Sequence, residues 1–345
     1  MTFPARSFRP APGLGNAHLQ TVWGRLARSR NLVPMRREVL ETPDGDELVL
    51  DHLDGSPQGP RVVLLHGLEG SSFSVYVQGM LALLALRGAR ATVLNFRSCA
   101  RDPRRPGRSL PNRRPRFYHS GETGDLGLVL RTLAGREQGV RLGALGVSLG
   151  GNVLLKWLGE NPRQELIGAA ATLSVPYDLE AGARHLERGL GALYVRMFLR
   201  TLRAKVRSLA SRFPEAASAV DLPRALASRT FVEFDDAATA PLHGFAGATD
   251  YYDRSSSIRF LPRITAPVLC LSAEDDPFLP ARVLPRAREA ASPSVSVVVT
   301  PRGGHAGFLA GEHPWRVSSW GEETAVSWVL DRLDRPDRLA PPVSS

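Results

Sequence analysis

Ser148 stands between two glycines, at positions 146 and 150, within the stretch ALGVSLGGNVLLKW. Small and apolar residues typical of a buried strand lead into it, and an amphipathic helical pattern follows directly. A serine on so tight a strand-to-helix turn exposes its hydroxyl, while the glycines let neighbouring backbone pass close by. The helix that begins there points its first amides toward the serine. The stretch therefore predicts a nucleophile at Ser148, with the Leu149 amide as a donor to an oxyanion.

A nucleophilic serine needs a base, and His305 is the best candidate among the eight histidines. It lies in PRGGHAGF, directly after the apolar run SVSVVVT, and the glycines let this loop bend back toward the serine. The acid that orients the base is expected in SAEDDPFLP, where the distance to Pro280 favours Asp276 over Asp275. Asp275 is then expected to be solvated or to cap the turn. The chain order serine, aspartate, histidine is that of α/β-hydrolases.

A second oxyanion donor is expected in the loop LLHGLEGSS, after the first long buried strand. The amide of Leu68 is the candidate, and His66 is expected to brace this loop by hydrogen bonding instead of acting as the base. Loss of one such donor costs on the order of 10²–10³ in turnover. This set of groups carries out acyl transfer without a metal or an organic cofactor, so none is expected.

Short apolar runs alternate with helical patterns over most of the chain. This alternation predicts an α/β fold with a mostly parallel sheet and helices on both faces. Two alternating runs around Pro43-Asp44-Gly45 predict an antiparallel hairpin at one edge. The expected buried strands are 61–67, 91–96, 141–148, 167–174, 266–276 and 294–301. Helices are expected at 74–88, 123–134, 149–161 and 322–333.

The predicted organisation is one α/β-hydrolase domain over 36–335, preceded by an arm over 1–35 and followed by a flexible tail over 336–345. The alternation is interrupted between about 177 and 245, where GALYVRMFLRTLRAKVRSLASRF forms an amphipathic basic helix. Excursions of this kind commonly carry lids, so this segment is expected to be a helical cap over the site. The alternative is an ordinary helix packed on the sheet.

The composition bears on the size of the core, the state of the cysteines, the location of the protein and its partners. The 345 residues carry a formal net charge of +10, and 43% of them are hydrophobic, enough for a large core. The two cysteines, Cys99 and Cys270, are expected to be reduced, and no signal-peptide or membrane-spanning pattern is present, so a cytoplasmic protein is expected. The arginine-rich loop 101–116 contains proline and glycine and no interleaved aromatic residues, so nucleic acid is not an expected partner.

Several segments together resemble the YheT-like branch of the α/β-hydrolase superfamily over nearly the whole chain. The resemblance implies a triad of Ser148, Asp276 and His305, and a form without the membrane anchor of eukaryotic members. It also includes His18, Gln20 and Thr21 of the arm and His119-Ser120, which are expected to hold the arm and a loop onto the body. The matching segments are NAHLQTVWGRL, LLHGLEGSS, NFRSCARDP, FYHSGETGDL, GVSLGGN, GFAGATDYYDRSS through IRFLPRITAPVLCLSAEDDPF, and GGHAGF.

These residues predict a serine hydrolase that cleaves carboxylic esters of short- to medium-chain acyl groups, lipids included. The basic surface favours acyl substrates with an anionic head and a possible contact with an anionic lipid surface. An acyltransferase or amidase on the same triad is an alternative, because alcohol, amine or water can each resolve an acyl-enzyme. A non-catalytic protein that binds anionic surfaces through a hydrolase scaffold is the other alternative. The oligomeric state is not predicted.

Overall fold

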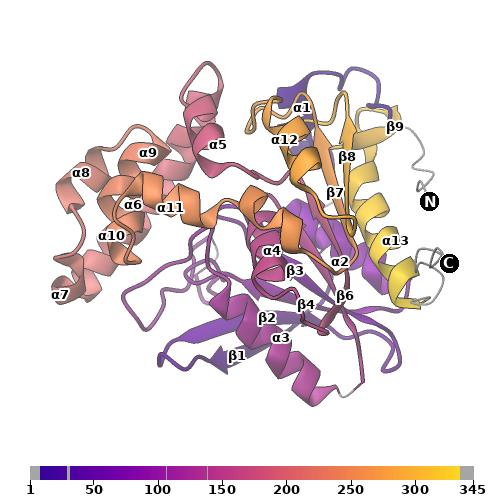
Figure 1. Ribbon diagram of the computed structural model, residues 1–345, viewed down its shortest axis with the longest axis horizontal. Helices are drawn as coiled ribbons and strands as arrows, with labels where there is room; N and C mark the ends of the chain where they lie inside the picture. Colours follow the sequence, from indigo (N-terminus) through magenta and orange to yellow (C-terminus); the bar gives the residue numbers. More distant parts are fainter. Residues whose placement is uncertain (1–7, 29–31, 106, 138, 335–345) are drawn as a thin grey trace.

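Alternating short apolar runs form a sheet of eight strands at the centre of the protein (Figure 1). The computed structural model describes residues 8–28, 32–105, 107–137 and 139–334. The strand order is β1-β2-β4-β3-β5-β6-β7-β8; β1 and β2 pair antiparallel, as do β2 and β4, and all other neighbours are parallel. The strands are β1 (Arg36–Glu41), β2 (Glu47–Leu53), β3 (Arg61–Leu65), β4 (Arg90–Asn95), β5 (Leu142–Val147), β6 (Ile167–Leu173), β7 (Val268–Ala273) and β8 (Val295–Thr300).

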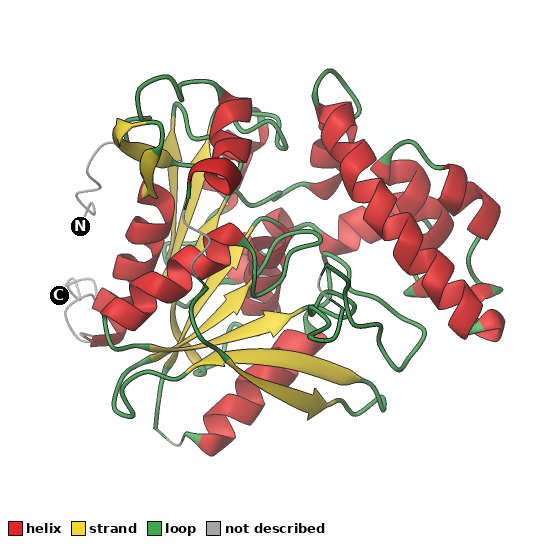
Figure 2. Ribbon diagram, turned by 180° about the vertical axis from the view of Figure 1, so that it is seen from behind, coloured by secondary structure: helices red, strands yellow, loops and turns green. Residues whose placement is uncertain are grey.

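Helices cover both faces of the sheet (Figure 2), because both faces of the strands are apolar. In β3, Val62 and Leu64 pack in one cluster, and Val63 and Leu65 pack in the other. The first cluster contains α2 (Val75–Leu86) and α13 (Trp320–Asp334). The second cluster contains α3 (Gly124–Arg136), α4 (Leu149–Glu160) and α12 (Val283–Ala290). The predicted α/β-hydrolase architecture, with its antiparallel N-terminal hairpin, is confirmed.

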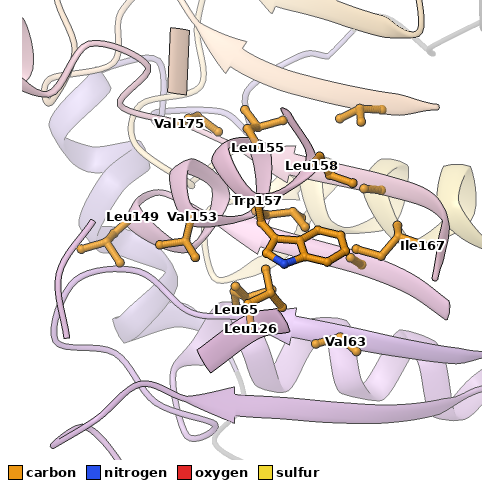
Figure 3. Packing of buried hydrophobic residues seen from close by; sticks show 14 of the residues in the cluster. Val63, Leu65, Leu126, Leu149, Val153, Leu155, Trp157, Leu158, Ile167 and Val175 are labelled. Carbon is orange, nitrogen blue, oxygen red and sulfur yellow. The ribbon is translucent and has the colours of Figure 1, made fainter. Parts of the chain in front are cut away.

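Trp157 fixes α4, the helix that begins directly after Ser148. Its side chain is 4% exposed and packs among Leu126 of α3 and Ile167 of β6 (Figure 3). A Cβ on Gly127 would lie 3.0 Å from the indole nitrogen, so the glycine on α3 leaves room for the ring. Burial of such a ring removes a large apolar area from water, and it anchors the helix against α3 and the sheet.

A helical insertion separates β6 from β7 and lies to one side of the sheet (Figure 1). It has a core of its own that includes Leu199, Phe234 and Ala238. Its elements are α5 (Leu179–Leu186), α6 (Gly191–Arg212), α7 (Pro214–Ala217), α8 (Leu222–Ala227), α9 (Phe231–Phe234), the π-helix η1 (Asp235–Thr239), α10 (Ala240–Leu242) and α11 (Ala248–Ser255). Two 3₁₀ turns, η2 (Ser257–Arg259) and η3 (Leu261–Arg263), lead back to the sheet.

Two further elements pack beside the sheet without having been predicted as secondary structure. They are α1 (Ala17–Ala27) and a separate hairpin of β9 (Leu309–His313) and β10 (Arg316–Ser319). Ala11 and Leu14 of the arm pack against Leu309 of this hairpin. The domain limits given above stay predictions, and the tail 336–345 lies outside the described residues.

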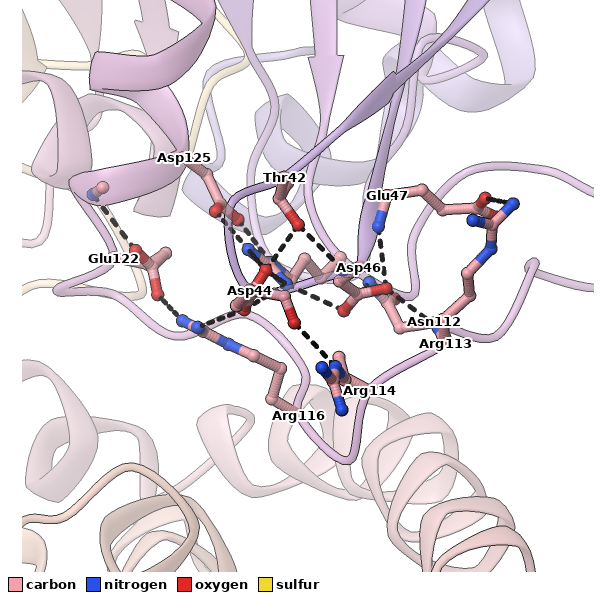
Figure 4. A network of polar contacts seen from close by, with 12 residues as sticks. Thr42, Asp44, Asp46, Glu47, Asn112, Arg113, Arg114, Arg116, Glu122 and Asp125 are labelled. Atoms are coloured by element: carbon pink, nitrogen blue, oxygen red, sulfur yellow. Dashed lines mark hydrogen bonds and ion pairs between the residues drawn. The ribbon is translucent and has the colours of Figure 1, made fainter.

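Three arginines at the end of the loop 101–116 bind polar groups of neighbouring segments. Arg116 reaches Asp44 and Glu122, and Arg114 donates to the carbonyl of Asp44 (Figure 4). Arg113 pairs with Glu47 at 2.7 Å. The β1-β2 hairpin thus supplies carboxylates to Arg113 and Arg116 and a carbonyl to Arg114, and these contacts hold the end of the loop in place. No helix in the described ranges is both long and apolar enough to cross a bilayer.

Candidate active site

Ser148 occupies a strained turn between β5 and α4. Its φ of 53° and ψ of −121° lie where L-residues are rarely found. A Cβ on Gly146 would lie 2.7 Å from the Gly151 Cα, and one on Gly150 would lie 2.5 Å from the Leu65 and His66 carbonyl oxygens. Only glycine fits at either position, as the sequence predicted. The Ser148 amide donates to the Leu173 carbonyl at 2.8 Å, which ties the turn to β6.

The structure brings Ser148, His305 and Asp276 into direct contact. His305 Nε2 lies 2.9 Å from the Ser148 Oγ, and His305 Nδ1 lies 2.9 and 3.1 Å from the two Asp276 carboxylate oxygens. With the proton on Nδ1, the imidazole donates to Asp276 and accepts from the serine hydroxyl. Asp276 is 5% exposed, and one of its oxygens also accepts the Phe278 amide at 2.8 Å. Side chains that follow β5, β7 and β8 thus meet at one edge of the sheet.

Asp275 has a different position from its neighbour. Its carboxylate accepts the Gly304 amide at 2.9 Å, one residue before His305 in the sequence. Burial raises the pKa of this carboxyl above its ordinary value, against the effect of the Gly304 hydrogen bond. Asp275 therefore braces the loop that carries the histidine, whereas it was expected to be solvated or to cap its own turn.

The loop after β3 lies against Ser148. A Cβ on Gly67 would lie 3.3 Å from the Ser148 Cβ, which places the backbone of this loop beside the serine. The amides of Leu68 and Leu149 donate to no acceptor among the described residues, so both are available to an oxygen bound there. The assignment of these two amides as the oxyanion donors stays a prediction.

His66 braces the same loop, as predicted. Its Nδ1 lies 2.8 Å from the Gly67 carbonyl, and its Nε2 accepts the Phe96 amide at 3.1 Å. Burial lowers the pKa of this imidazole to about 4, so the ring is neutral at physiological pH. His66 therefore connects the ends of β3 and β4 and does not contact the serine hydroxyl.

The arm holds the loop that carries His305. The Thr21 hydroxyl of α1 accepts the His305 amide at 3.0 Å. Gln20, buried beside it, donates to the Leu14 and Leu309 carbonyls and accepts the Leu309 amide at 2.7 Å. Through these contacts Gln20 and Thr21 join the arm to the loop and hairpin that follow β8.

The other residues of the implied pattern hold neighbouring elements. His18 Nδ1 lies 3.1 Å from the Tyr194 hydroxyl, and this contact joins α1 to α6 of the insertion. The Ser120 amide donates to the Tyr251 hydroxyl at 2.9 Å, and the Ser120 carbonyl accepts from the Asn152 side chain at 2.9 Å. His119 packs with its ring centroid 4.4 Å from that of His243.

Two side chains near the histidine were not identified from the sequence. The Phe278 ring is stacked on the His305 imidazole, with centroids 4.1 Å apart and planes 8° apart. The Ser174 hydroxyl accepts the Ala306 amide at 2.8 Å. Both residues follow strands whose carboxyl ends form the site. Their place just after the carboxyl end of a parallel strand could have identified them, because ligand sites of parallel sheets lie at this edge.

A largely buried ion pair, with its Lys205 and Glu69 side chains 14% and 12% exposed, joins the insertion to the loop after β3. Lys205 of α6 lies 2.5 Å from a carboxylate oxygen of Glu69, whose φ is 57°. The Tyr118 hydroxyl accepts the Glu69 amide at 2.6 Å, and Lys205 Nζ also lies 3.3 Å from the Cys99 Sγ. Burial alone would raise the pKa of Glu69, but Lys205 and neighbouring hydroxyls lower it, so the pair is ionised. The residue after Leu68 is thereby fixed by the insertion.

A pocket of about 880 Å³ opens onto Ser148 and His305. One wall comes from α1 and the loop after β3, and the other comes from the insertion. The size is typical of pockets for small organic ligands. In the part of the chain that the structure describes, no group of three or more residues is arranged to hold a metal ion. Apolar and aromatic side chains of the insertion that line the pocket include Leu179, Leu186, Tyr194, Met197, Phe198, Leu202, Phe231, Tyr251 and Tyr252.

Comparisons with known proteins agree with this architecture. The alpha/beta hydrolase fold family matches residues 60–312. A protein of Escherichia coli (strain K12) named "Putative esterase YheT" is 36% identical, over 95% of this chain and 94% of that protein. Phospholipase ABHD3 of Mus musculus is 33% identical, over 88% of this chain and 76% of that protein.

Among solved structures, alpha/beta hydrolase domain-containing protein 10 from mouse superposes with a TM-score of 0.52. The match covers 88% of this chain and 100% of the mouse protein, at 12% sequence identity, so it supports the fold alone. The family match and the full-length relative agree with each other and with the observed sheet. This chain belongs to the α/β-hydrolase family, in its YheT-like branch.

Proposed function

We propose that this protein is a serine hydrolase that cleaves carboxylic esters of short- to medium-chain acyl groups, lipids included. Ser148 is the nucleophile, His305 the general base and acid, and Asp276 the carboxylate that orients the imidazole. The amides of Leu68 and Leu149 stabilise the oxyanion. The observation that carries the proposal is the hydrogen-bonded path from Ser148 through His305 to Asp276, at 2.9 Å on each side of the ring.

In the proposed reaction the Ser148 hydroxyl passes its proton to His305 Nε2 as Oγ attacks the acyl carbonyl. The carbonyl oxygen becomes an oxyanion that accepts hydrogen bonds from the two amides. His305 then returns the proton to the leaving alcohol, and the acyl group stays on Oγ. Water attacks the acyl-enzyme with His305 as the base, which releases the carboxylic acid and restores the serine. Asp276 stabilises the imidazolium in both halves.

The pocket supports an acyl chain as the main recognised group. Its walls are largely apolar, and Arg28 and Glu69, two charged residues among them, are held in ion pairs with Glu322 and Lys205. A relative at 33% identity is named a phospholipase, which supports extending the proposal to lipid esters. The proposal includes a cytoplasmic location and no cofactor.

Hydrolysis of p-nitrophenyl esters from acetate to laurate tests the proposal. Ser148→Ala is expected to lower kcat by on the order of 10⁶, because the covalent step is lost. Ser98→Ala is the matched control. Ser98 is another serine with a positive φ, 65°, but its hydroxyl is bonded to Asn112 away from the histidine. Retained esterase activity in Ser148→Ala would remove the role assigned to Ser148.

The same assay separates hydrolysis from acyl transfer. With an alcohol or amine added as acceptor, the proposal predicts that free carboxylic acid remains the main product. A main product esterified to the acceptor would make the protein an acyltransferase, and faster cleavage of anilides than of matched esters would make it an amidase. Equal rates on anionic and neutral esters of one chain length would contradict a preference for an anionic head.

A further inference from the structure

Two helices at the mouth of the pocket expose apolar side chains in the same pattern. On α1, Leu19, Val22 and Leu26 are 37%, 38% and 64% exposed. At the start of α6, Leu190, Leu193 and Met197 are 59%, 56% and 56% exposed. In each set the residues stand three and then four positions apart, which places them along one side of a helix. Val22 and Met197 also line the pocket, so both apolar stripes border its opening.

The two stripes belong to adjacent helices. His18 of α1 and Tyr194 of α6 are 3.1 Å apart at Nδ1 and the hydroxyl, and their rings are stacked with an 18° interplanar angle. Next to α1, Trp315 is 56% exposed and packs on Trp23, with ring centroids 4.6 Å apart. An exposed tryptophan beside an apolar stripe is typical of proteins that rest in the boundary region of a bilayer.

Positive charge surrounds these stripes. Arg25 on α1 and Arg196, Arg200 and Arg207 on α6 are exposed, and none of them forms an ion pair with a described residue. Neither helix contains an aspartate or a glutamate. Arg196 and Arg200 each follow an exposed apolar residue of α6 by three positions, so they flank the stripe. Within the loop 101–116, by contrast, Arg113 and Arg116 are paired with carboxylates of the β1-β2 hairpin.

We propose that this face docks on an anionic lipid surface. We call it the rim face and define it by Leu19, Val22, Leu26, Leu190, Leu193, Met197, Arg25, Arg196 and Arg200. Its apolar side chains would enter the acyl boundary while its arginines contact anionic headgroups. The pocket mouth would then open onto the lipid, so an acyl chain could reach Ser148 without crossing water. This use of the face rests on the proposed function, whereas the docking itself does not.

Co-sedimentation of the full chain with vesicles tests the docking. Vesicles contain phosphatidylcholine alone, or phosphatidylcholine with about one third phosphatidylglycerol, at about 0.1 M and about 0.5 M salt. We expect binding to the anionic vesicles, weaker binding at high salt, and at least tenfold weaker binding to phosphatidylcholine alone. Equal binding to both vesicle types, or none to either, would overturn the proposal.

Matched variants locate the docking face. The double variant Arg196→Gln/Arg200→Gln is expected to weaken binding at least tenfold, at roughly fivefold for each arginine. The double variant Leu26→Glu/Leu193→Glu should abolish vesicle binding, because it removes the apolar contact with the acyl boundary. The control is Arg141→Gln/Arg163→Gln, two exposed arginines at the opposite end of the sheet, before β5 and β6. If the control weakens binding as much as the rim variants do, attraction is non-specific and the rim face is not the docking site.

Two further readouts separate this proposal from its alternatives. Ser148→Ala should bind vesicles like the wild type, so docking can hold even if the esterase assignment fails. Hydrolysis of water-soluble p-nitrophenyl acetate should be unchanged in Leu26→Glu/Leu193→Glu, while hydrolysis of esters presented in anionic vesicles should fall at least tenfold. A dimer in sedimentation velocity that these substitutions dissociate, with vesicle binding unchanged, would show that a second copy covers the rim face instead.

Discussion

The aromatic ring of Phe278 lies parallel to the imidazole of His305, with centroids 4.1 Å apart and planes 8° apart. Phe278 also packs against Tyr194 and Phe198 of α6, with ring centroids 4.9 and 6.1 Å away. The histidine is therefore fixed by Asp276 in the plane of its ring and by an aromatic stack across that plane. This stack connects the proposed base to the helical insertion.

Removal of the stack should slow the reaction more than it weakens binding. Phe278→Leu keeps an apolar side chain but loses the ring that faces the imidazolium, a contact worth roughly 1–2 kcal/mol when desolvated. We expect kcat to fall roughly five- to thirtyfold with a smaller change in KM, and Phe278→Tyr to retain most activity. Steady-state kinetics on a p-nitrophenyl ester measure both constants. A change confined to KM would show that Phe278 only shapes the pocket.

The two adjacent aspartates should differ sharply in kinetics. Asp276→Asn removes the carboxylate that holds His305 Nδ1–H, and we expect kcat to fall on the order of 10⁴. Asp275→Asn leaves that contact and retains an oxygen for the Gly304 amide, so the fall should be about tenfold or less. Comparison of kcat for the two variants is the measurement. Equal losses would contradict the separation of roles.

The Lys205–Glu69 pair should matter strongly for stability. Lys205→Met leaves the buried Glu69 carboxylate without its cation, and breaking such a pair costs roughly 3–5 kcal/mol in free energy of unfolding. Lys205→Met/Glu69→Gln removes both charges and should recover most of that loss. Urea unfolding of the two variants measures the difference. A double variant no more stable than Lys205→Met would contradict this account.

The other lysine of the chain supplies the control for that experiment. Lys156 of α4 pairs with Glu160 one helical turn away, and the glutamate side chain is 31% exposed. Because water reaches this pair, Lys156→Met should cost roughly 1 kcal/mol or less. A loss as large as that of Lys205→Met would show that any lysine removal destabilises the fold to the same degree.

Asp235 should make stability depend on pH. It lines the pocket on η1, its oxygens accept the Thr239 and Tyr252 hydroxyls, and burial raises its pKa from 3.8 to about 6. The folded protein therefore binds this proton more tightly than the unfolded chain, and stability is lost as pH rises from about 4 through about 6. Asp235→Asn cannot ionise, so its free energy of unfolding should gain on that of the wild type by on the order of 1–2 kcal/mol between pH 5 and pH 7.5, with a matching gain in melting temperature.

Replacement of the neighbouring Asp236 by asparagine should change stability at neutral pH in the opposite direction. Its carboxylate accepts the Ala248 amide and pairs with Arg224, and these contacts lower its pKa. Stability from this group is present at neutral pH, so Asp236→Asn should lower the melting temperature there. The measurement is the melting temperature of each variant relative to the wild type across this pH range. A parallel response of the two variants would contradict the assignment to Asp235.

Much of the fold and of the site could be predicted from the sequence because the signals are local. The buried strands carry short apolar runs. The direct turn from a strand into a helix at Ser148 needs residues without a side chain on both sides, and Gly146 and Gly150 meet that need. The convergence of Ser148, Asp276 and His305 followed from a topological rule: residues after parallel strands meet at one edge of the sheet. None of these inferences needed contacts between distant side chains.

The features that were not predicted depend on tertiary contacts. In the sequence Phe278 is an ordinary apolar residue of a loop, and only the folded structure shows that it lies beside His305. In the sequence Lys205 is one of several basic residues on an amphipathic helix. Its contact with Glu69 depends on how α6 packs against the loop after β3. The helix α1 has no acidic residue in its first turn, and its place is set by the bonds from Gln20 and Thr21 to residues almost three hundred positions later.

Covalent labelling of the serine tests the central claim most directly. Cleavage after Arg141 and Lys156 releases LGALGVSLGGNVLLK, in which Ser148 is the single hydroxyl-bearing residue. After treatment with a fluorophosphonate, mass spectrometry should find the adduct on this peptide, and the His305→Ala protein should label at least 10³-fold more slowly. An adduct on another peptide, or labelling at the wild-type rate without His305, would contradict the proposal that this histidine activates Ser148.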